Sequence, residues 1–150
     1  MINFDSYMTK TIEGQIMVRG KGTGFVKHED YAEDLIVVRE DLGFALDGDL
    51  VELELNPEVL GRRAGGKVTK VVHQAHRELI GVVKEKTVDG VAMRYLAPDN
   101  HRIHIRPLLP DTDVNDMDMK VAVEIDSWTD AKADPVGKIV ETLGRAGDHE

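Results

Sequence analysis

The sequence contains no cysteine, which excludes both a disulfide framework and a zinc site built on thiolates. Aromatic residues make up only 5% of the 150 residues, so any hydrophobic core must consist mainly of valine, isoleucine and leucine. No apolar run approaches the roughly 20 residues that a membrane-spanning helix needs, and the N-terminus lacks a secretory signal pattern. We therefore expect a cytoplasmic protein with no membrane partner.

Positive charge is also scarce. The net charge is −9, and acidic residues outnumber basic ones in both halves of the chain. A nucleic-acid-binding domain usually carries a basic surface. Here any such binding would depend on a local basic strip, because the negative electrostatic field of the whole chain repels nucleic acid. The isolated chain is therefore expected to bind nucleic acid weakly.

The sequence is rich in signals for short strands. Residues 68–72 and 121–125 alternate between apolar and polar or small side chains, as half-buried strands do. A glycine-rich segment at residues 20–24 separates two strand-like runs and is typical of a hairpin. The Asp47-Gly48-Asp49 turn signal directly precedes another strand at residues 50–55. Helix signals are sparse, and only a short turn is expected at residues 39–46.

Four landmarks occur twice in the same order. Phe25 is matched by Tyr95, which lies 70 residues later, and VELEL at residues 51–55 returns as VAVEI at 121–125. The remaining pairs are residues 14–18 with 81–84, and residues 66–68 with 137–139. Two similar units of five short strands each are the simplest explanation, and a small closed barrel removes their exposed edges.

The sequence therefore predicts an all-β chain with two consecutive five-stranded β-barrels. The expected boundaries are an N-terminal extension (residues 1–10), a first barrel (11–73), a second barrel (77–144) and a C-terminal tail (145–150).

Several motifs resemble the cold-shock domains of the RNase II/RNase R exoribonuclease family. KGTGFV (residues 21–26) followed by DLIV (34–37) resembles the cold-shock hairpin and its next strand. ALDGDLV (45–51) is similar to an element of the family's first cold-shock domain. APDNHRI (97–103) and PVGKIVETLG (135–144) are similar to segments of the second. The resemblance covers nearly the whole chain, from Thr11 to Gly144.

The resemblance implies that both five-stranded barrels are OB folds of the cold-shock type. It also implies a module that binds and guides single-stranded RNA for a hydrolytic 3′–5′ exoribonuclease. In that family a catalytic domain with Mg²⁺-holding aspartates follows the cold-shock domains. The chain stops before the position at which that domain would begin. We therefore expect no catalysis and no cofactor in this chain, with Mg²⁺ confined to the catalytic domain of a longer parent protein.

OB folds bind nucleic-acid strands by stacking bases on aromatic side chains while Lys and Arg follow the phosphates. Alternation along the strand places Phe25 on the face that this family leaves open, unless the ring packs inside the barrel. Tyr95 is expected at the equivalent position of the second unit, either as a stacking platform or as an ordinary barrel tyrosine. The candidate RNA-binding residues are Arg19, Lys21, Phe25, Lys27, Tyr95, Arg102 and Arg106. Thr23, Ile36 and Val38 stand where stronger cold-shock binders have aromatic or histidine side chains, so little stacking surface is expected in the first unit.

Other sites are not supported by the sequence. The pairs His73/His76 and His101/His104 have metal-like spacing, but no further ligand completes a zinc site. Residues 111–122 fail as a calcium loop because they lack the required glycine and glutamate. The glycines of residues 20–24 lead into a strand and therefore do not form a phosphate loop. Trp128 is expected to pack in the core or between domains.

The alternative to RNA binding is a tandem β-barrel that binds another protein and has little RNA affinity. The acidic charge and the scarcity of aromatic residues favour this alternative. The ordered motifs favour the RNA-binding module.

Overall fold

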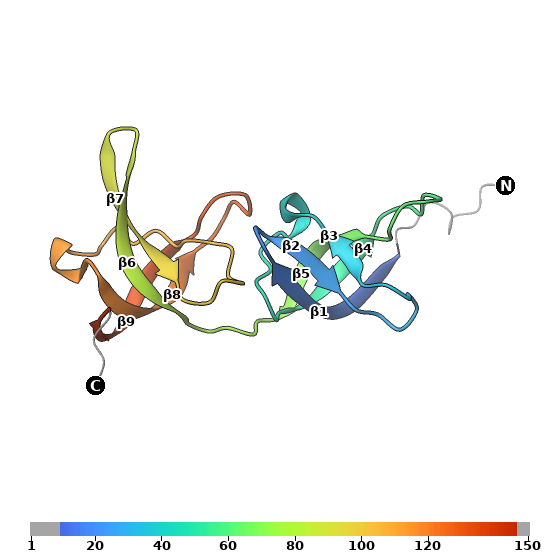
Figure 1. Cartoon of the computed structure of the whole chain (residues 1–150), viewed down its shortest axis with the longest axis horizontal. Helices are drawn as coiled ribbons and strands as arrows, with labels where there is room; N and C mark the ends of the chain where they lie inside the picture. The colour runs from blue at the N-terminus through green and yellow to red at the C-terminus, as the bar shows by residue number, and fades with distance from the viewer. Residues whose placement is uncertain (1–9, 147–150) are drawn as a thin grey trace. The chain divides into compact units, whose positions relative to one another are not determined.

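The computed structural model describes residues 10–146 and forms two compact units, Met1–Ala75 and His76–Glu150 (Figure 1). The division between them falls between residues 75 and 76. Most of the expected N-terminal extension and the end of the C-terminal tail lie outside the described residues. None of the described residues belongs to a helix that is long and apolar enough to cross a membrane.

Unit 1 contains five antiparallel strands in the order β3-β2-β1-β4-β5. A parallel bridge from Ile36 to Gly65 joins the two edges of this sheet and closes the barrel. The predicted short turn of helix is a 3₁₀ turn, η2 (Arg39–Asp41). The strands are β1 (Thr11–Arg19), β2 (Thr23–Val26), β3 (Leu35–Val37), β4 (Leu50–Leu55) and β5 (Gly66–His73).

The core of unit 1 follows from the alternation of side chains along its strands. Ile16 and Val18 on β1, and Val26 on β2, point inward and are completely buried. Gly24 also faces this core, and an added Cβ there would lie 2.7 Å from the Cδ1 of Ile16, so that side chain would have to shift. The residues that alternate with these face outward and form the surface that carries the candidate site.

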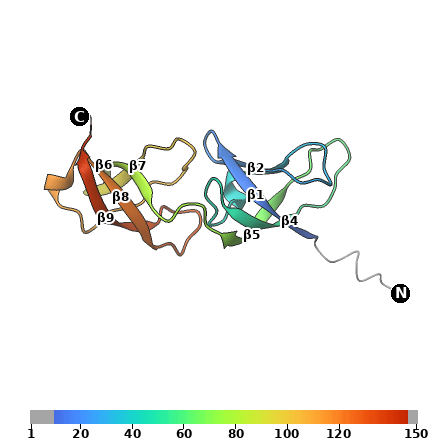
Figure 2. The same ribbon diagram turned by 90° about the horizontal axis from the view of Figure 1, so that it is seen from below.

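Unit 2 contains four antiparallel strands in the order β7-β6-β8-β9 (Figure 2). The β6–β7 hairpin extends beyond the rest of this unit (Figure 1). Asp89 and Gly90 form its two-residue turn, with φ angles of 51° and 79°. Asp-Gly suits such a turn because both central residues need a positive φ. The strands are β6 (Leu79–Val88), β7 (Val91–Pro98), β8 (Met119–Ser127) and β9 (Val136–Arg145).

The predicted fifth strand of unit 2 is reduced to a single bridging residue. Leu108 pairs with Tyr95 on one side and with Val136 on the other. Its N–H donates to Pro135 O at 2.8 Å, and its carbonyl accepts from Gly137 N at 2.8 Å. Prolines occupy positions 107 and 110 and cannot donate backbone hydrogen bonds, so a longer ladder does not form. The barrel-type, all-β fold is confirmed, and the count of five full strands in unit 2 is corrected to four.

In unit 1 the buried Asp49 carboxylate stabilises the turn before β4 by accepting backbone hydrogen bonds. Its carboxylate is 2% exposed and accepts from the N–H groups of Leu46 at 2.9 Å and Ala75 at 2.8 Å. The neighbouring Asp47 carboxylate accepts from Val18 N at 2.8 Å. The Asp-Gly-Asp signal is therefore structural, because both carboxylates bind backbone donors that would otherwise lack partners.

Replacement of Asp49 with alanine is expected to lower the free energy of unfolding by about 2–3 kcal/mol, because the buried Leu46 N–H loses its charged acceptor. Urea unfolding followed by far-UV circular dichroism measures this loss. Glu40→Ala, which removes an exposed carboxylate from the same unit, serves as the control and should change stability by less than about 0.5 kcal/mol. Equal stabilities of the two variants would contradict this role of Asp49.

Candidate functional site

The outer face of unit 1 carries one aromatic residue in the middle of its three-stranded side. Phe25 on β2 pairs with Met17 on β1 and with Ile36 on β3, so the three side chains lie next to one another. All three are half-buried and belong to the outward-facing positions of their strands. Phe25 does not belong to the buried core of the barrel. Its ring is thus part of a shallow apolar strip on the surface.

The cation over the Phe25 ring comes from the loop between β4 and β5. The Arg63 guanidinium carbon lies 5.6 Å from the ring centroid. Arg63 Nε donates to Asp34 O at 2.9 Å and lies 3.6 Å from Glu33 Oε2, so two contacts hold the side chain in place. Sequence reasoning missed Arg63, because nothing in the sequence shows that residue 63 approaches residue 25.

The three cations that were expected near Phe25 are all exposed. Arg19 pairs with Thr23 across the hairpin, Lys21 lies in its turn, and Lys27 follows the end of β2. Arg39 Nη1 donates to Lys21 O at 2.7 Å and anchors the turn. The sequence thus located the cations along the β1–β2 hairpin, but the ring itself is contacted by Arg63.

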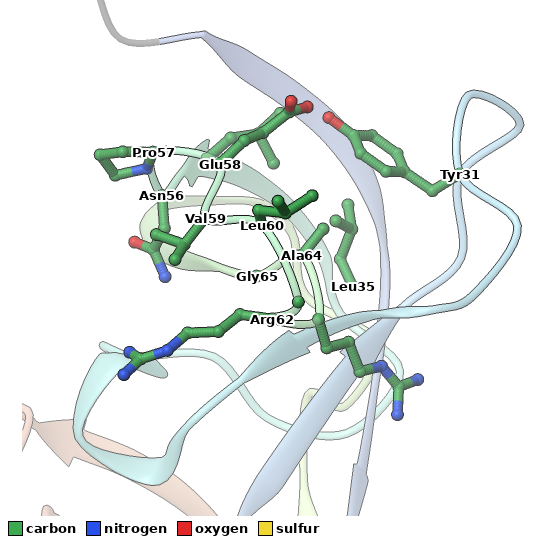
Figure 3. A pocket seen from close by; sticks show the side chains of 13 residues that line it. Tyr31, Leu35, Asn56, Pro57, Glu58, Val59, Leu60, Arg62, Ala64 and Gly65 are labelled. Carbon is green, nitrogen blue, oxygen red and sulfur yellow. The ribbon is translucent and has the colours of Figure 1, made fainter.

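A hollow of about 830 Å³ lies beside this site, at the end of the barrel under the β4–β5 loop (Figure 3). Leu35 and Ala64 contribute apolar surface, and Tyr31 lies at the rim opposite Glu58. Leu60, in the loop, is fully exposed. Because Arg63 lines the hollow and also lies over Phe25, the hollow and the aromatic strip are neighbours.

The equivalent position of unit 2 is occupied by Tyr95, as the repeat predicted. Tyr95 pairs with Lys84 on β6 and with the bridging residue Leu108, and its side chain is half-buried. Two cations lie over its ring: Lys86 Nζ at 5.2 Å and the Arg106 guanidinium at 5.8 Å from the centroid. The structure therefore brings together Tyr95 and Arg106, both of which were expected, and adds Lys86.

Arg102 is the other candidate RNA-binding residue of the segment that follows Tyr95. It lies in an exposed turn, where its backbone N–H donates to Asn100 Oδ1 at 3.0 Å. The cations over the Tyr95 ring are Lys86 and Arg106.

Three lysines of unit 2 lie next to carboxylates from loops. Lys84 Nζ is 2.8 Å from Asp118 Oδ1, and this hydrogen bond, together with the positive charge of Lys84, holds the pKa of Asp118 below its ordinary value. The other two pairs are Lys120–Asp99 at 2.8 Å and Lys86–Asp134 at 3.9 Å. The lysines near Tyr95 thus carry their own counterions.

Trp128 is half-buried, and its Nε1 donates to Asp130 O at 3.0 Å and Ala133 O at 3.1 Å, which fastens the β8–β9 loop. In residues 10–146 no group of three or more His, Asp or Glu side chains is arranged to hold a metal ion.

Each unit therefore presents an outward aromatic ring on a strand of its barrel, with one cation over Phe25 and two over Tyr95. An aromatic ring can stack against a planar, electron-rich group, and the neighbouring cations can contact anions. This combination is the one by which OB folds hold nucleic-acid strands.

Comparison with known proteins identifies relatives over most of the chain. Residues 95–150 match the family model of the cold shock domain. The chain is 27% identical over 136 residues to ribonuclease R of Escherichia coli (strain K12) and to ribonuclease R of Shigella flexneri. These alignments cover 89% of this chain and only 16% of the length of each curated relative.

Solved structures share the fold. The apo form of Mycoplasma genitalium RNase R superposes with a TM-score of 0.75 at 21% identity, over 91% of this chain and 22% of that one. The same protein in complex with ribose-methylated single-stranded RNA gives a TM-score of 0.76 at 21% identity and the same coverage. Yeast Ssd1, described as a pseudonuclease, gives 0.70 at 16% identity, over 92% of this chain and 23% of that one. The resemblance inferred from the motifs is confirmed at this level: the chain is similar to ribonuclease R over 136 residues, and residues 95–150 match the cold shock domain.

Proposed function

We propose that this chain binds single-stranded RNA on the outer faces of its two barrels and guides it, as part of an RNase R/RNase II-like 3′–5′ exoribonuclease. The observation that carries this proposal is the pair of outward aromatic rings, Phe25 and Tyr95, each with a cation over it at the same position of the repeat. The solved complex of a structurally similar RNase R with single-stranded RNA supports it.

The number of aromatic rings limits the affinity. Each stacked base contributes roughly 1–3 kcal/mol, and each unit offers a single ring on this face. A base that reaches Phe25 must share the ring with the Arg63 guanidinium or stack on the guanidinium plane itself, which also stacks well on bases. Binding should therefore be weak, depend little on base sequence, and rest partly on charge.

In this proposal the chain itself cuts no RNA. Hydrolysis and Mg²⁺ binding belong to a catalytic domain in a longer parent protein. That domain would be the partner of this RNA-binding module within the parent protein. A cytoplasmic location is part of the same proposal.

A protein-binding role is the second candidate, and the hollow of unit 1 favours it. Val59 and Leu60 expose apolar surface on the loop that covers this hollow. Exposed apolar surface of this kind often marks a contact with another protein. The net charge of −9 also favours a partner other than RNA.

Replacement of Phe25 or Tyr95 with alanine should weaken RNA binding by roughly 1–3 kcal/mol each, because each change removes one stacking surface. The measurement is a fluorescence anisotropy titration with a labelled single-stranded RNA at low salt. Phe44→Ala, which removes an exposed phenylalanine that belongs to none of the strands β1, β2 and β3, is the matched control and should leave binding unchanged. Folded Phe25→Ala and Tyr95→Ala variants that bind as well as the parent would favour the protein-binding role.

Replacement of Lys21 and Lys27 together with glutamine should reduce the salt dependence of binding while the fold remains intact. Each lost phosphate contact lowers the slope of log K against log salt by about 0.7 for a single strand. Titrations between low and moderate salt measure this slope, and duplex RNA should bind more poorly in the same assay because its bases are not free to stack. A slope equal to that of the parent would show that these two lysines do not contact the RNA phosphates.

Incubation of the chain with end-labelled RNA and Mg²⁺ should leave the RNA at full length. Gel electrophoresis over several hours tests this expectation, with a nuclease-free buffer sample as the control. Shortening from the 3′ end that disappears in variants of this chain would show that it is catalytic by itself.

A further inference from the structure

The outer face of unit 2 gathers three lysines from neighbouring strands. Lys84 and Lys86 alternate along β6, and Lys120 on β8 pairs with Val82, the next outward residue of β6. Side chains two residues apart on a strand, and those directly opposite in register, share a face of the sheet. The three ammonium groups therefore lie on the face that also carries Tyr95, which pairs with Lys84.

Each of these lysines is joined to an aspartate from outside its own strand. Asp118 immediately precedes β8, Asp99 follows β7, and Asp134 lies in the β8–β9 loop. Asp134 also accepts from the backbone N–H of Arg106 at 3.0 Å, so it lies beside both cations that cover Tyr95. Three loops thus converge on one face, and each brings a carboxylate to one lysine.

We propose that Asp99, Asp118 and Asp134 set the affinity of unit 2 for RNA by competing with the phosphates for its lysines. This inference rests on the proposed RNA-binding function and concerns how strongly its site holds its ligand. A phosphate that approaches one of these lysines also approaches the partner carboxylate. The aspartate then cancels part of the attraction between the lysine and the phosphate, or the lysine–aspartate ion pair must open.

These three lysine–aspartate ion pairs are weak enough for a phosphate to replace the aspartate. An exposed ion pair contributes little to stability, and the lysines and aspartates of all three pairs are between one third and two thirds exposed. These pairs are therefore weak enough for several adjacent phosphates to open them together. The low pKa of the Asp118 carboxyl shows that this group stays charged near neutral pH, so its competition with phosphate persists there.

The test compares three single variants, Asp99→Asn, Asp118→Asn and Asp134→Asn, with the parent in RNA titrations by anisotropy. Each should bind single-stranded RNA more tightly by roughly two- to fivefold, the effect that corresponds to one exposed ion pair. Each should also steepen the salt slope by about 0.7, because one more lysine becomes available to a phosphate. Asparagine preserves an acceptor oxygen and the left-handed backbone of Asp118 (φ 63°), so the fold is retained.

Asp89→Asn is the matched control. Asp89 also has a left-handed backbone (φ 51°), lies in the same unit, and forms no ion pair with the residues that the structure describes. Its replacement changes the net charge by the same amount. A gain in affinity for Asp89→Asn equal to that of the three variants would assign the effect to overall charge and overturn the inference.

A double-mutant cycle tests whether Asp118 acts through Lys84. In a Lys84→Met background the further change Asp118→Asn should no longer raise the affinity by more than the Asp89→Asn control does. The carboxyl of Asp118, followed by NMR in the absence of RNA, should titrate below 3.8 in the parent and closer to 3.8 in Lys84→Met. An Asp118→Asn effect that persists undiminished without Lys84 would contradict the inference.

The outcomes separate this inference from the proposed function. A parent chain that binds no single-stranded RNA at low salt would refute the RNA-binding function itself. A parent that binds RNA, with three aspartate variants that bind no more tightly than Asp89→Asn, would refute only the role of the aspartates.

Discussion

Closure of the barrel is the constraint on which the remaining features depend. A strand in a closed barrel has one face inside and one outside, so the two-residue period of the side chains divides every strand into core and surface. In unit 1 the bridge from Ile36 to Gly65 completes this closure, and in unit 2 Leu108 does so. Because the inner positions are filled by valine, leucine and isoleucine, the few aromatic side chains on these strands are left outside. The location of Phe25 and Tyr95 follows from this division.

Much of the fold could be predicted because it depends on the two-residue alternation along strands and on an internal repeat. The spacing of 70 residues between Phe25 and Tyr95 located equivalent positions in the two units, and alternation along the strand placed Phe25 on the outer face. The Asp89-Gly90 turn was available in the same way, since Asp-Gly between apolar runs is a strong hairpin signal. The long β6–β7 hairpin thus depends on a local turn signal and not on the repeat.

The cations over the rings were predicted less well because loops bring them there. Arg63 reaches Phe25 from a loop 38 residues further along the chain, and no sequence period reports such a contact. The aspartates that join Lys84, Lys86 and Lys120 also come from loops. The total charge can be counted from the sequence, but which acidic side chains lie beside these lysines cannot. An acidic chain therefore retains a face with lysines, although their charge is largely compensated.

The reduction of the fifth strand in unit 2 to Leu108 has a consequence for motion. Between β6 and β7 eight residue pairs form a continuous ladder, whereas a short segment between two prolines joins β7 to β9. Amide hydrogens are protected from exchange with solvent by the cooperative structure around them, so the seam along Leu108 should exchange faster than the β6–β7 ladder. Tyr95 lies on this seam, beside Arg106. A ligand that contacts both residues would hold the two sides of the seam together. Slower amide exchange at Leu108 and Gly137 would then indicate that the ligand is bound.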